Sequence, residues 1–411
     1  MRRNIVLGAL LSVLFGGLAL PGTGFAGPLQ PNATYTGGVA FSADAVRGDI
    51  GTITCPAAGL CLRVDTTASN ILPSPNTLPV TVRAAFLYNV TIFGASPLST
   101  QAILGGVPVT LSLLSGTDPT PVNLQTYRAD VTSIVGALVN GAPGVTQIPV
   151  TALTLSPGSD GLALVVVFAS AGLDPSQSVA ILDGGQAGPA VQTTAFNLAN
   201  PIDKNIPNFN AVLSLGIQFS DQEGLGHTCG QNPAFAQFST VDVNGARLTS
   251  CAGNADDGAL MSGALITVGG VGDSTANPSD PFCRAGDSCS TTDDELYGIA
   301  GFLKQGDTQV RITTANPSND DSIFLAVLQL TAAACTVGVN CPPPCTGADC
   351  PCTGADCPCT GADCPCAGAN CPCTGANCPP PPPGVPGPAT LILLGAGLLA
   401  LIAGSRLFRR R

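Results

Sequence analysis

The chain has 411 residues, of which 10% are charged, and it contains 50 Gly, 36 Pro and 18 Cys. Its formal net charge is −11 with a single His, so a broad basic surface for nucleic acid is excluded. A large, even number of cysteines is typical of disulfides formed in an oxidising compartment and argues against free cytosolic thiols.

The N-terminus has the features of a secretory signal peptide. Arg2 and Arg3 precede an apolar run over residues 5–20, and small residues follow up to Ala26. A basic start, a short apolar core and a small-residue exit are typical of a cleaved leader. We therefore expect signal peptidase to remove residues 1–26 by cutting between Ala26 and Gly27.

The body from residue 80 onwards shows one strand pattern after another. Residues 80–88 place Val80, Val82, Ala84, Phe86 and Tyr88 on one face, and residues 107–113 alternate in the same way. This period of two indicates half-buried strands. Residues 161–168 are apolar throughout, which is typical of a strand buried on both faces. The other predicted elements are strands over 178–183, 211–219, 241–243, 265–268, 310–313 and 323–330, and one short helix around 129–138.

These segments predict an all-β fold, because the chain is poor in charge and rich in Gly, Thr, Ser and Val. A body of roughly 300 residues is large for one sandwich. We therefore expect two tandem antiparallel β-sandwiches, jelly-roll-like, over residues 27–200 and 201–334. A single long jelly roll with insertions is the alternative. Residues 221–294 are predicted to form long loops on the second sandwich.

Several short motifs in this body resemble a domain of unknown function found in secreted and surface proteins of bacteria and archaea. In chain order they are Ala84–Tyr88, Tyr127–Thr132, Gly161–Phe168, Asp183–Gly185, Val243–Gly245 and Asp320–Ile323. The resemblance implies a surface protein and carries no activity.

Six cysteines lie in the body. Nearest-neighbour pairing would join Cys55 to Cys61, Cys229 to Cys251, and Cys283 to Cys289. Each bridge would close a loop and would not tie distant parts of the chain together. Because six cysteines permit many pairings, closeness in the sequence is the only argument for this one.

Residues 335–384 form a cysteine- and proline-rich stretch. Between Cys345 and Pro379 the unit Cys-Thr/Ala-Gly-Ala-Asp/Asn-Cys-Pro occurs five times. Gly and Asx residues accept turn geometry, so each short loop could bring its two cysteines within disulfide distance. We predict a stiff stalk stapled through Cys345, Cys350, Cys352, Cys357, Cys359, Cys364, Cys366, Cys371, Cys373 and Cys378. Thiolate binding of zinc or copper is the alternative, but the export signal and the lack of supporting His favour disulfides.

The last 27 residues contain three features in order. Val385, Pro386, Gly387 and Pro388 stand first, an apolar stretch over residues 389–404 follows, and the chain closes on basic residues. The apolar stretch is slightly short for a spanning helix. The basic residues place the C-terminus on the cytoplasmic side of a membrane. They are Arg406, Arg409, Arg410 and Arg411. An ordinary C-terminal anchor is one interpretation.

This three-part arrangement resembles the PEP-CTERM sorting signal of Gram-negative bacteria, which a membrane enzyme, the exosortase, recognises and processes. Gly387 stands where that signal usually has Glu. The resemblance implies a precursor inserted in the inner membrane and then delivery to the cell surface or the extracellular space. Exopolysaccharide is the usual setting of such systems.

Removing both termini makes the exported body more acidic. The termini contain no Asp or Glu and hold six of the 15 basic residues, which leaves 9 basic against 26 acidic side chains and a net charge of −17. Solubility is the ordinary consequence of such a charge, and nucleic acid is a poor partner for it.

Residues suited to catalysis are few. His227 lies beside Cys229 in a Gly-rich segment, and no nucleophile elbow, phosphate loop or zinc-protease motif occurs. We therefore predict no catalytic residue and no resident metal or cofactor. A structural calcium is the one alternative, because acidic side chains are dense late in the body. They are Asp256, Asp257, Asp273, Asp280, Asp287, Asp293, Asp294, Glu295, Asp320 and Asp321.

Two functional classes remain open. One is a surface structural or adhesive protein, with exopolysaccharide as a candidate partner. The other is a carbohydrate-binding module or secreted hydrolase whose site cannot be recognised from sequence. Sugar platforms favour exposed Trp and Tyr, and this chain has no Trp and four Tyr. That composition favours the structural or adhesive interpretation.

Overall fold

The computed structural model describes residues 29–47, 60–91, 99–114, 124–152, 159–185, 191–219, 239–253, 266–275, 295–317 and 321–333. All of these belong to the first of two compact units, residues 1–341. The expected signal peptide, cysteine stalk and sorting signal lie outside the described residues. Among the residues that are described, no helix is long and apolar enough to cross a membrane.

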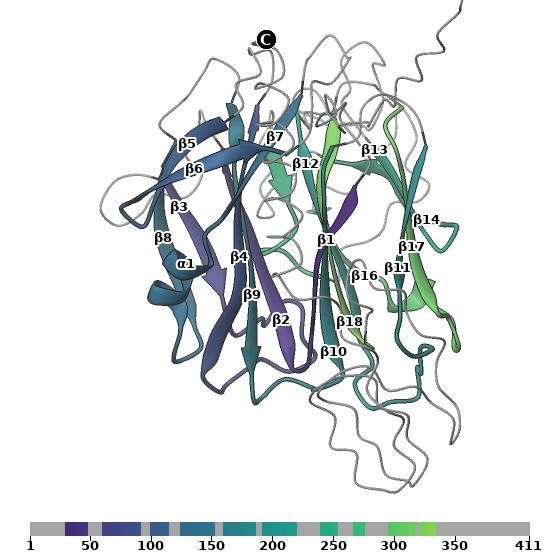
Figure 1. Ribbon diagram of the computed structural model, residues 1–411. Helices are drawn as coiled ribbons and strands as arrows, with labels where there is room; N and C mark the ends of the chain where they lie inside the picture. The colour runs from purple at the N-terminus through teal and green to yellow at the C-terminus, as the bar shows by residue number, and fades with distance from the viewer. Residues whose placement is uncertain are drawn as a thin grey trace, which may run out of the picture. The chain divides into compact units, whose positions relative to one another are not determined.

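Antiparallel strands dominate the described residues and form three sheets, with a short helix α1 (Thr132–Val139) and a 3-10 turn (Ala300–Phe302) beside them (Figure 1). The largest sheet, which we call the barrel-like sheet, has eight strands. In sheet order these are β2 (Val39–Arg47), β9 (Ser159–Ser170), β4 (Val80–Thr91), β7 (Gln125–Asp130), β6 (Val107–Leu113), β5 (Ser99–Leu104), β8 (Val145–Ala152) and β3 (Leu60–Asp65).

The two edges of the barrel-like sheet are fastened to each other by side chains. On β2, Ser42 Oγ accepts a hydrogen bond from the backbone N–H of Asp65 at 3.0 Å. Two residues further on, Asp44 Oδ2 accepts one from the backbone N–H of Arg63 at 2.5 Å. The Arg63 guanidinium also pairs with Asp44 Oδ1 at 2.7 Å. These bonds occupy N–H groups that an open edge would expose, so the sheet closes nearly into a barrel. Its interior contains an apolar cluster, with Leu62, Leu87, Leu104, Leu111, Tyr127, Ile148 and Leu162 fully buried.

A second sheet, the central sheet, is buried on both faces. Its strands are β1 (Gln30–Thr36), β10 (Gln177–Asp183), β18 (Ser322–Thr331), β12 (Ala211–Gln218) and β15 (Ile266–Val268), and β16 (Leu296–Gly298) also pairs with β12. Every residue of β10, β12 and β18 is buried. Alternate side chains explain this burial. Val179, Ile181 and Val327 pack with the outer face of the barrel-like sheet, while Leu182, Leu213 and Leu328 pack in a second apolar layer.

The third sheet, the outer sheet, covers that second layer. Its order is β11 (Gln192–Asn197), β17 (Gln309–Ala315), β13 (Ser239–Val243) and β14 (Ala246–Ala252). Along β17 the buried Val310 and Ile312 alternate with the exposed Arg311. One face of the outer sheet therefore joins the core and the other is polar.

The all-β class is confirmed, but the division expected near residue 200 does not separate the sheets. β10 precedes that boundary and pairs with β18, which follows it. In the same way β11 precedes it and pairs with β17. Two sandwiches built from contiguous halves of the chain would keep these pairs apart. The reason for the difference is that a strand as apolar as β10 needs hydrogen-bonding neighbours on both sides, and here they come from both ends of the body, β1 and β18.

The strands predicted from periodicity are present at β4, β6, β9, β10, β12, β13, β15, β17 and β18, and the predicted helix is α1. The expected common face of β4 is wrong at one residue. Val82 lies in the barrel interior, whereas Ala84, Phe86 and Tyr88 face the central sheet. A register shift between Val82 and Ala84 is the cause, because one extra residue turns the following side chains to the opposite face.

Candidate functional site

A buried carboxylate joins the central sheet to the barrel-like sheet. Asp183 ends β10, and its Oδ2 accepts hydrogen bonds from Asn32 Nδ2 at 2.8 Å, from the Tyr88 hydroxyl at 2.8 Å and from Arg128 Nη1 at 2.5 Å. These donors lie on β1, β4 and β7. The Asp183 side chain is 4% exposed. We call these four residues the Asp183 cluster.

Burial sets the protonation behaviour of this cluster. Loss of solvent raises the pKa of Asp183 above its usual value, while Arg128 and the hydrogen bonds from Tyr88 and Asn32 counteract the rise. Burial, and next the neighbouring Asp183, raises the pKa of Tyr88 well above its usual value, so this hydroxyl stays a neutral donor. The Arg128 guanidinium also lies over the Phe86 ring, 5.5 Å from its centroid. All of these contacts stabilise the junction of two sheets and leave the carboxylate shielded from solvent.

The Asp183 cluster brings together residues from separate sequence motifs. Tyr88, Arg128 and Asp183 belong to three of the short sequence motifs, Ala84–Tyr88, Tyr127–Thr132 and Asp183–Gly185. The hydrogen bond from Tyr88 to Asp183 connects residues 95 apart in sequence, and that from Arg128 connects residues 55 apart. These motifs therefore lie close together in the fold, where their side chains link the central sheet to the barrel-like sheet.

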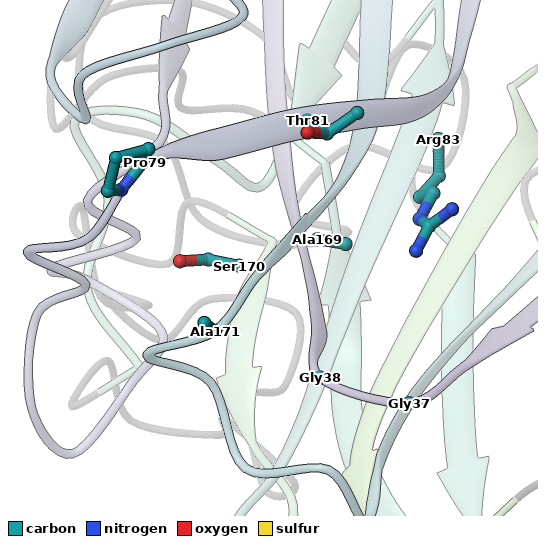
Figure 2. A pocket seen from close by; sticks show the side chains of 8 residues that line it. All are labelled: Gly37, Gly38, Pro79, Thr81, Arg83, Ala169, Ser170 and Ala171. Carbon is teal, nitrogen blue, oxygen red and sulfur yellow. The ribbon is translucent and has the colours of Figure 1, made fainter.

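A first surface recess lies at the start of β4 and measures about 420 Å³. Figure 2 shows Thr81 and Arg83 on β4 facing the recess, with the Gly37–Gly38 turn and Ser170 around it. Gly37 has φ +90° and Gly38 has φ +65°, values that favour glycine. Ser170 Oγ donates a hydrogen bond to Asn76 Oδ1 at 3.0 Å, so it stabilises the wall of the recess. The recess thus offers a ligand one exposed cation, Arg83.

A second recess lies over the exposed face of β17 and measures about 450 Å³. We call it the β17 groove. Its polar lining comes from β11, from the turn between β13 and β14, from the turn before β17 and from β17 itself. The residues that matter below are Thr193, Asn244, Lys304, Asp307, Arg311 and Thr313.

Asn244 fixes the rim of the β17 groove. It has φ +50° and precedes Gly245 at φ +79°, which is the backbone of a tight hairpin turn. Its Oδ1 accepts a hydrogen bond from the Arg311 backbone N–H at 2.9 Å, and its Nδ2 donates to Asp307 Oδ2 at 3.0 Å. Asp307 Oδ2 also accepts the backbone N–H of Lys304 at 2.9 Å. One side chain from the Val243–Gly245 motif therefore holds three segments of the groove together.

The structure accounts for few of the residues singled out in the sequence. Cys61 is disulfide-bonded, and its pairing with Cys55 stays a prediction because Cys55 lies outside the described residues. The described residues also do not include Cys229, Cys283, Cys289 and His227. For Cys251 the structure describes only the backbone, which lies on β14.

Three of the acidic residues considered for calcium are described, and all three are buried. Asp273 Oδ2 accepts the backbone N–H of Gly270 at 2.6 Å, and Asp321 Oδ2 accepts the Ser239 hydroxyl at 2.7 Å. Glu295 Oε1 accepts the backbone N–H of Gly253 at 2.5 Å. These carboxylates are therefore not solvated loop residues. Within the described ranges no group of three or more His, Cys, Asp or Glu side chains is placed to hold a metal ion.

Comparison with known proteins identifies no family. No protein-family model matches the chain, and no curated protein sequence matches it. Among solved structures, a β-porphyranase of glycoside hydrolase family 86 from the human gut bacterium Bacteroides plebeius is similar at 10% identity and a TM-score of 0.20. PNGF-II is similar at 10% identity and a TM-score of 0.23.

The chain spans 36% of the length of that β-porphyranase and 65% of the length of PNGF-II, while 74% and 71% of this chain are covered. A third structure, BuGH86 in complex with neoagarooctaose, shows 10% identity and a TM-score of 0.17, with 73% of this chain and 33% of that chain covered. TM-scores this low establish neither a shared fold nor a shared activity.

Proposed function

We propose that the chain is an exported cell-surface or extracellular-matrix protein that adheres to extracellular polysaccharide and catalyses no reaction of its own. The observation that carries this proposal is the β17 groove, a polar concavity on the open face of a sheet whose other face is locked into the core. An exposed polar face on a sheet that packs against the core suits adhesion.

The use of the buried charges supports a non-catalytic role. Asp44 and Asp183 each pair with an arginine and fasten strands to each other. Acid–base catalysis on a sugar needs two titratable groups that face the substrate. In the β17 groove, Asp307 is the single carboxylate among the described lining residues, and it accepts hydrogen bonds from Asn244 and from the Lys304 backbone.

The proposal includes the route of export. Residues 385–411 would act as the sorting signal, with the helix over residues 389–404 inserted in the inner membrane until an exosortase removes it. Residues 335–384 would then form the disulfide-stapled spacer that presents the body. The support is the order of motif, apolar stretch and arginines in the sequence.

A carbohydrate-binding module or a secreted hydrolase is the alternative function. The hydroxyl and amide groups of Thr193, Thr313 and Asn244 in the groove are the observation that favours it, because such groups bind sugar hydroxyls.

Cell fractionation tests the proposed export and destination. In cells that have the exosortase, we expect a shortened protein in the extracellular polysaccharide fraction. Deleting the exosortase, or replacing Arg406, Arg409, Arg410 and Arg411 by Gln, should leave the full-length precursor in the membrane. A Gly387→Glu variant is the matched control and should be processed as the parent is. Full-length protein that stays in the membrane both with and without the exosortase would show that the C-terminus is an ordinary anchor.

A further inference from the structure

The floor of the β17 groove is a ladder of hydroxyl and amide groups. Gln309, Arg311 and Thr313 occupy the outward positions of β17. Thr313 pairs with Thr193 across the sheet, with their Oγ1 atoms 2.9 Å apart. Gln309 Nε2 donates to Asn197 Oδ1 at 2.8 Å. These cross-strand bonds hold the polar side chains in place before any ligand arrives.

Two cations lie in this groove without an acidic partner among the described residues. The Arg311 guanidinium donates from Nε and Nη2 to the neutral Gln309 Oε1 at 3.2 and 3.1 Å. The Lys304 ammonium has no hydrogen-bond acceptor in the described part of the chain, although its backbone N–H binds Asp307. The carboxylate of Asp307 is occupied by neutral donors. The groove therefore holds two positive charges against one negative charge.

Three other described cations pair with acids, whereas Lys204 donates to the backbone carbonyls of Ala300 and Leu303 and Arg83 lies exposed in the first recess. Arg63 pairs with Asp44 at 2.7 Å, and Arg128 pairs with Asp183 at 2.5 Å. Even the exposed Arg247 pairs with Asp242 at 2.5 Å. Acidic side chains outnumber basic ones 26 to 9 in the body, so two cations without an acidic partner in one recess concentrate positive charge there. Lys304 and Arg311 together therefore leave positive charge available to a ligand in the β17 groove.

We infer that the β17 groove binds the acidic groups of an extracellular polysaccharide, namely carboxylates or sulfate esters on the sugar units. This inference rests on the proposed polysaccharide adhesion and names the class of polymer. A guanidinium can hold a carboxylate or sulfate through two parallel hydrogen bonds, and an ammonium adds a second charge contact. No aromatic side chain is among the groove's described lining residues, so charge and hydrogen bonds provide recognition in place of ring stacking.

Affinity electrophoresis of the full-length protein, solubilised in a neutral detergent, tests this inference with three probes. Polygalacturonate carries carboxylates, dextran sulfate carries sulfate esters, and dextran is neutral. We expect retardation by at least one acidic polymer, weakening as salt concentration rises. The Lys304→Gln/Arg311→Gln double variant should lose about tenfold in affinity for that polymer. Both side chains are at the surface, so the fold should persist, and a melting curve checks it.

Arg83→Gln is the matched control, because it removes an exposed cation from the other recess. It should change the affinity by less than about twofold, compared with the loss of about tenfold expected for the double variant. Equal losses in the control and the double variant would show non-specific attraction by charge and overturn the inference. So would unchanged binding in the double variant. Binding of dextran as tight as binding of the acidic polymers would overturn the acidic class while leaving polysaccharide adhesion intact. No binding to any polymer would contradict both.

Discussion

A chain that ends at residue 200 is expected to be insoluble, or soluble without a cooperative unfolding transition. It would contain the barrel-like sheet together with β1 and β10 but would lack β12 and β18. The outer face of the barrel-like sheet would then expose side chains such as Phe41, Val165 and Val167. Each such side chain contributes about 1.5–3 kcal/mol when buried. Several of them together match the whole stability of a domain, about 5–15 kcal/mol.

The matched comparison is a chain that ends at residue 341, where the first compact unit ends. We expect this longer chain to be soluble and to unfold in one transition, measured by circular dichroism during thermal and urea unfolding. A cooperative transition in the chain that ends at residue 200 would support the tandem arrangement of independent sandwiches and contradict the shared central sheet.

Replacing Arg128 by Leu is expected to lower the free energy of unfolding by about 3 kcal/mol. The Asp183 carboxylate is 4% exposed and would lose its cation while still buried. Removing one partner of a buried ion pair is costly because the other charge stays out of water. Urea unfolding followed by fluorescence or circular dichroism measures the loss.

Arg247→Leu is the control for this prediction, since the Arg247–Asp242 pair is exposed. We expect it to change stability by less than about 1 kcal/mol. Equal effects of the two substitutions would show that the Asp183 cluster does not fasten the sheets.

The pH dependence of the Arg128→Leu variant has a definite sign. Burial already raises the pKa of Asp183 above its unfolded value, and Arg128 opposes the rise. Without Arg128 the pKa should rise further. A raised pKa in the folded state adds stability that is full below the unfolded pKa and is lost as pH rises through the folded pKa. The gap between parent and variant should therefore be widest at neutral pH and should narrow as the solution is acidified. A gap that widens on acidification would contradict the assigned cause.

Periodicity in the sequence predicted the strands that have clean patterns. Residues 107–113 alternate, and β6 has the same bounds. Residues 161–168 are apolar throughout, and β9 is buried along that length. β2 was not predicted, because it contains Asp44 within a run of small residues. Arg63 on another strand pairs with Asp44 and stabilises its buried carboxylate there. Local patterns do not show such pairings.

The candidate site depends on contacts that are further apart in the sequence. The polar positions Gln309, Arg311 and Thr313 could be recognised from the alternation along β17. The position of Asn244 beside this strand could not be recognised from the sequence, because its hydrogen bond with Arg311 joins residues 67 apart. The same holds for the strand order of the central sheet, which is set by β10 and β18 packing between two apolar layers.

Light scattering of extracellular polysaccharide mixed with the purified protein tests the central claim most directly. It reports both whether the protein associates with the polymer and whether the polymer becomes shorter. We predict association with the polymer and a molar mass of the recovered polysaccharide that does not change over prolonged incubation. A falling molar mass would show a hydrolase, and the absence of association would remove the adhesive function.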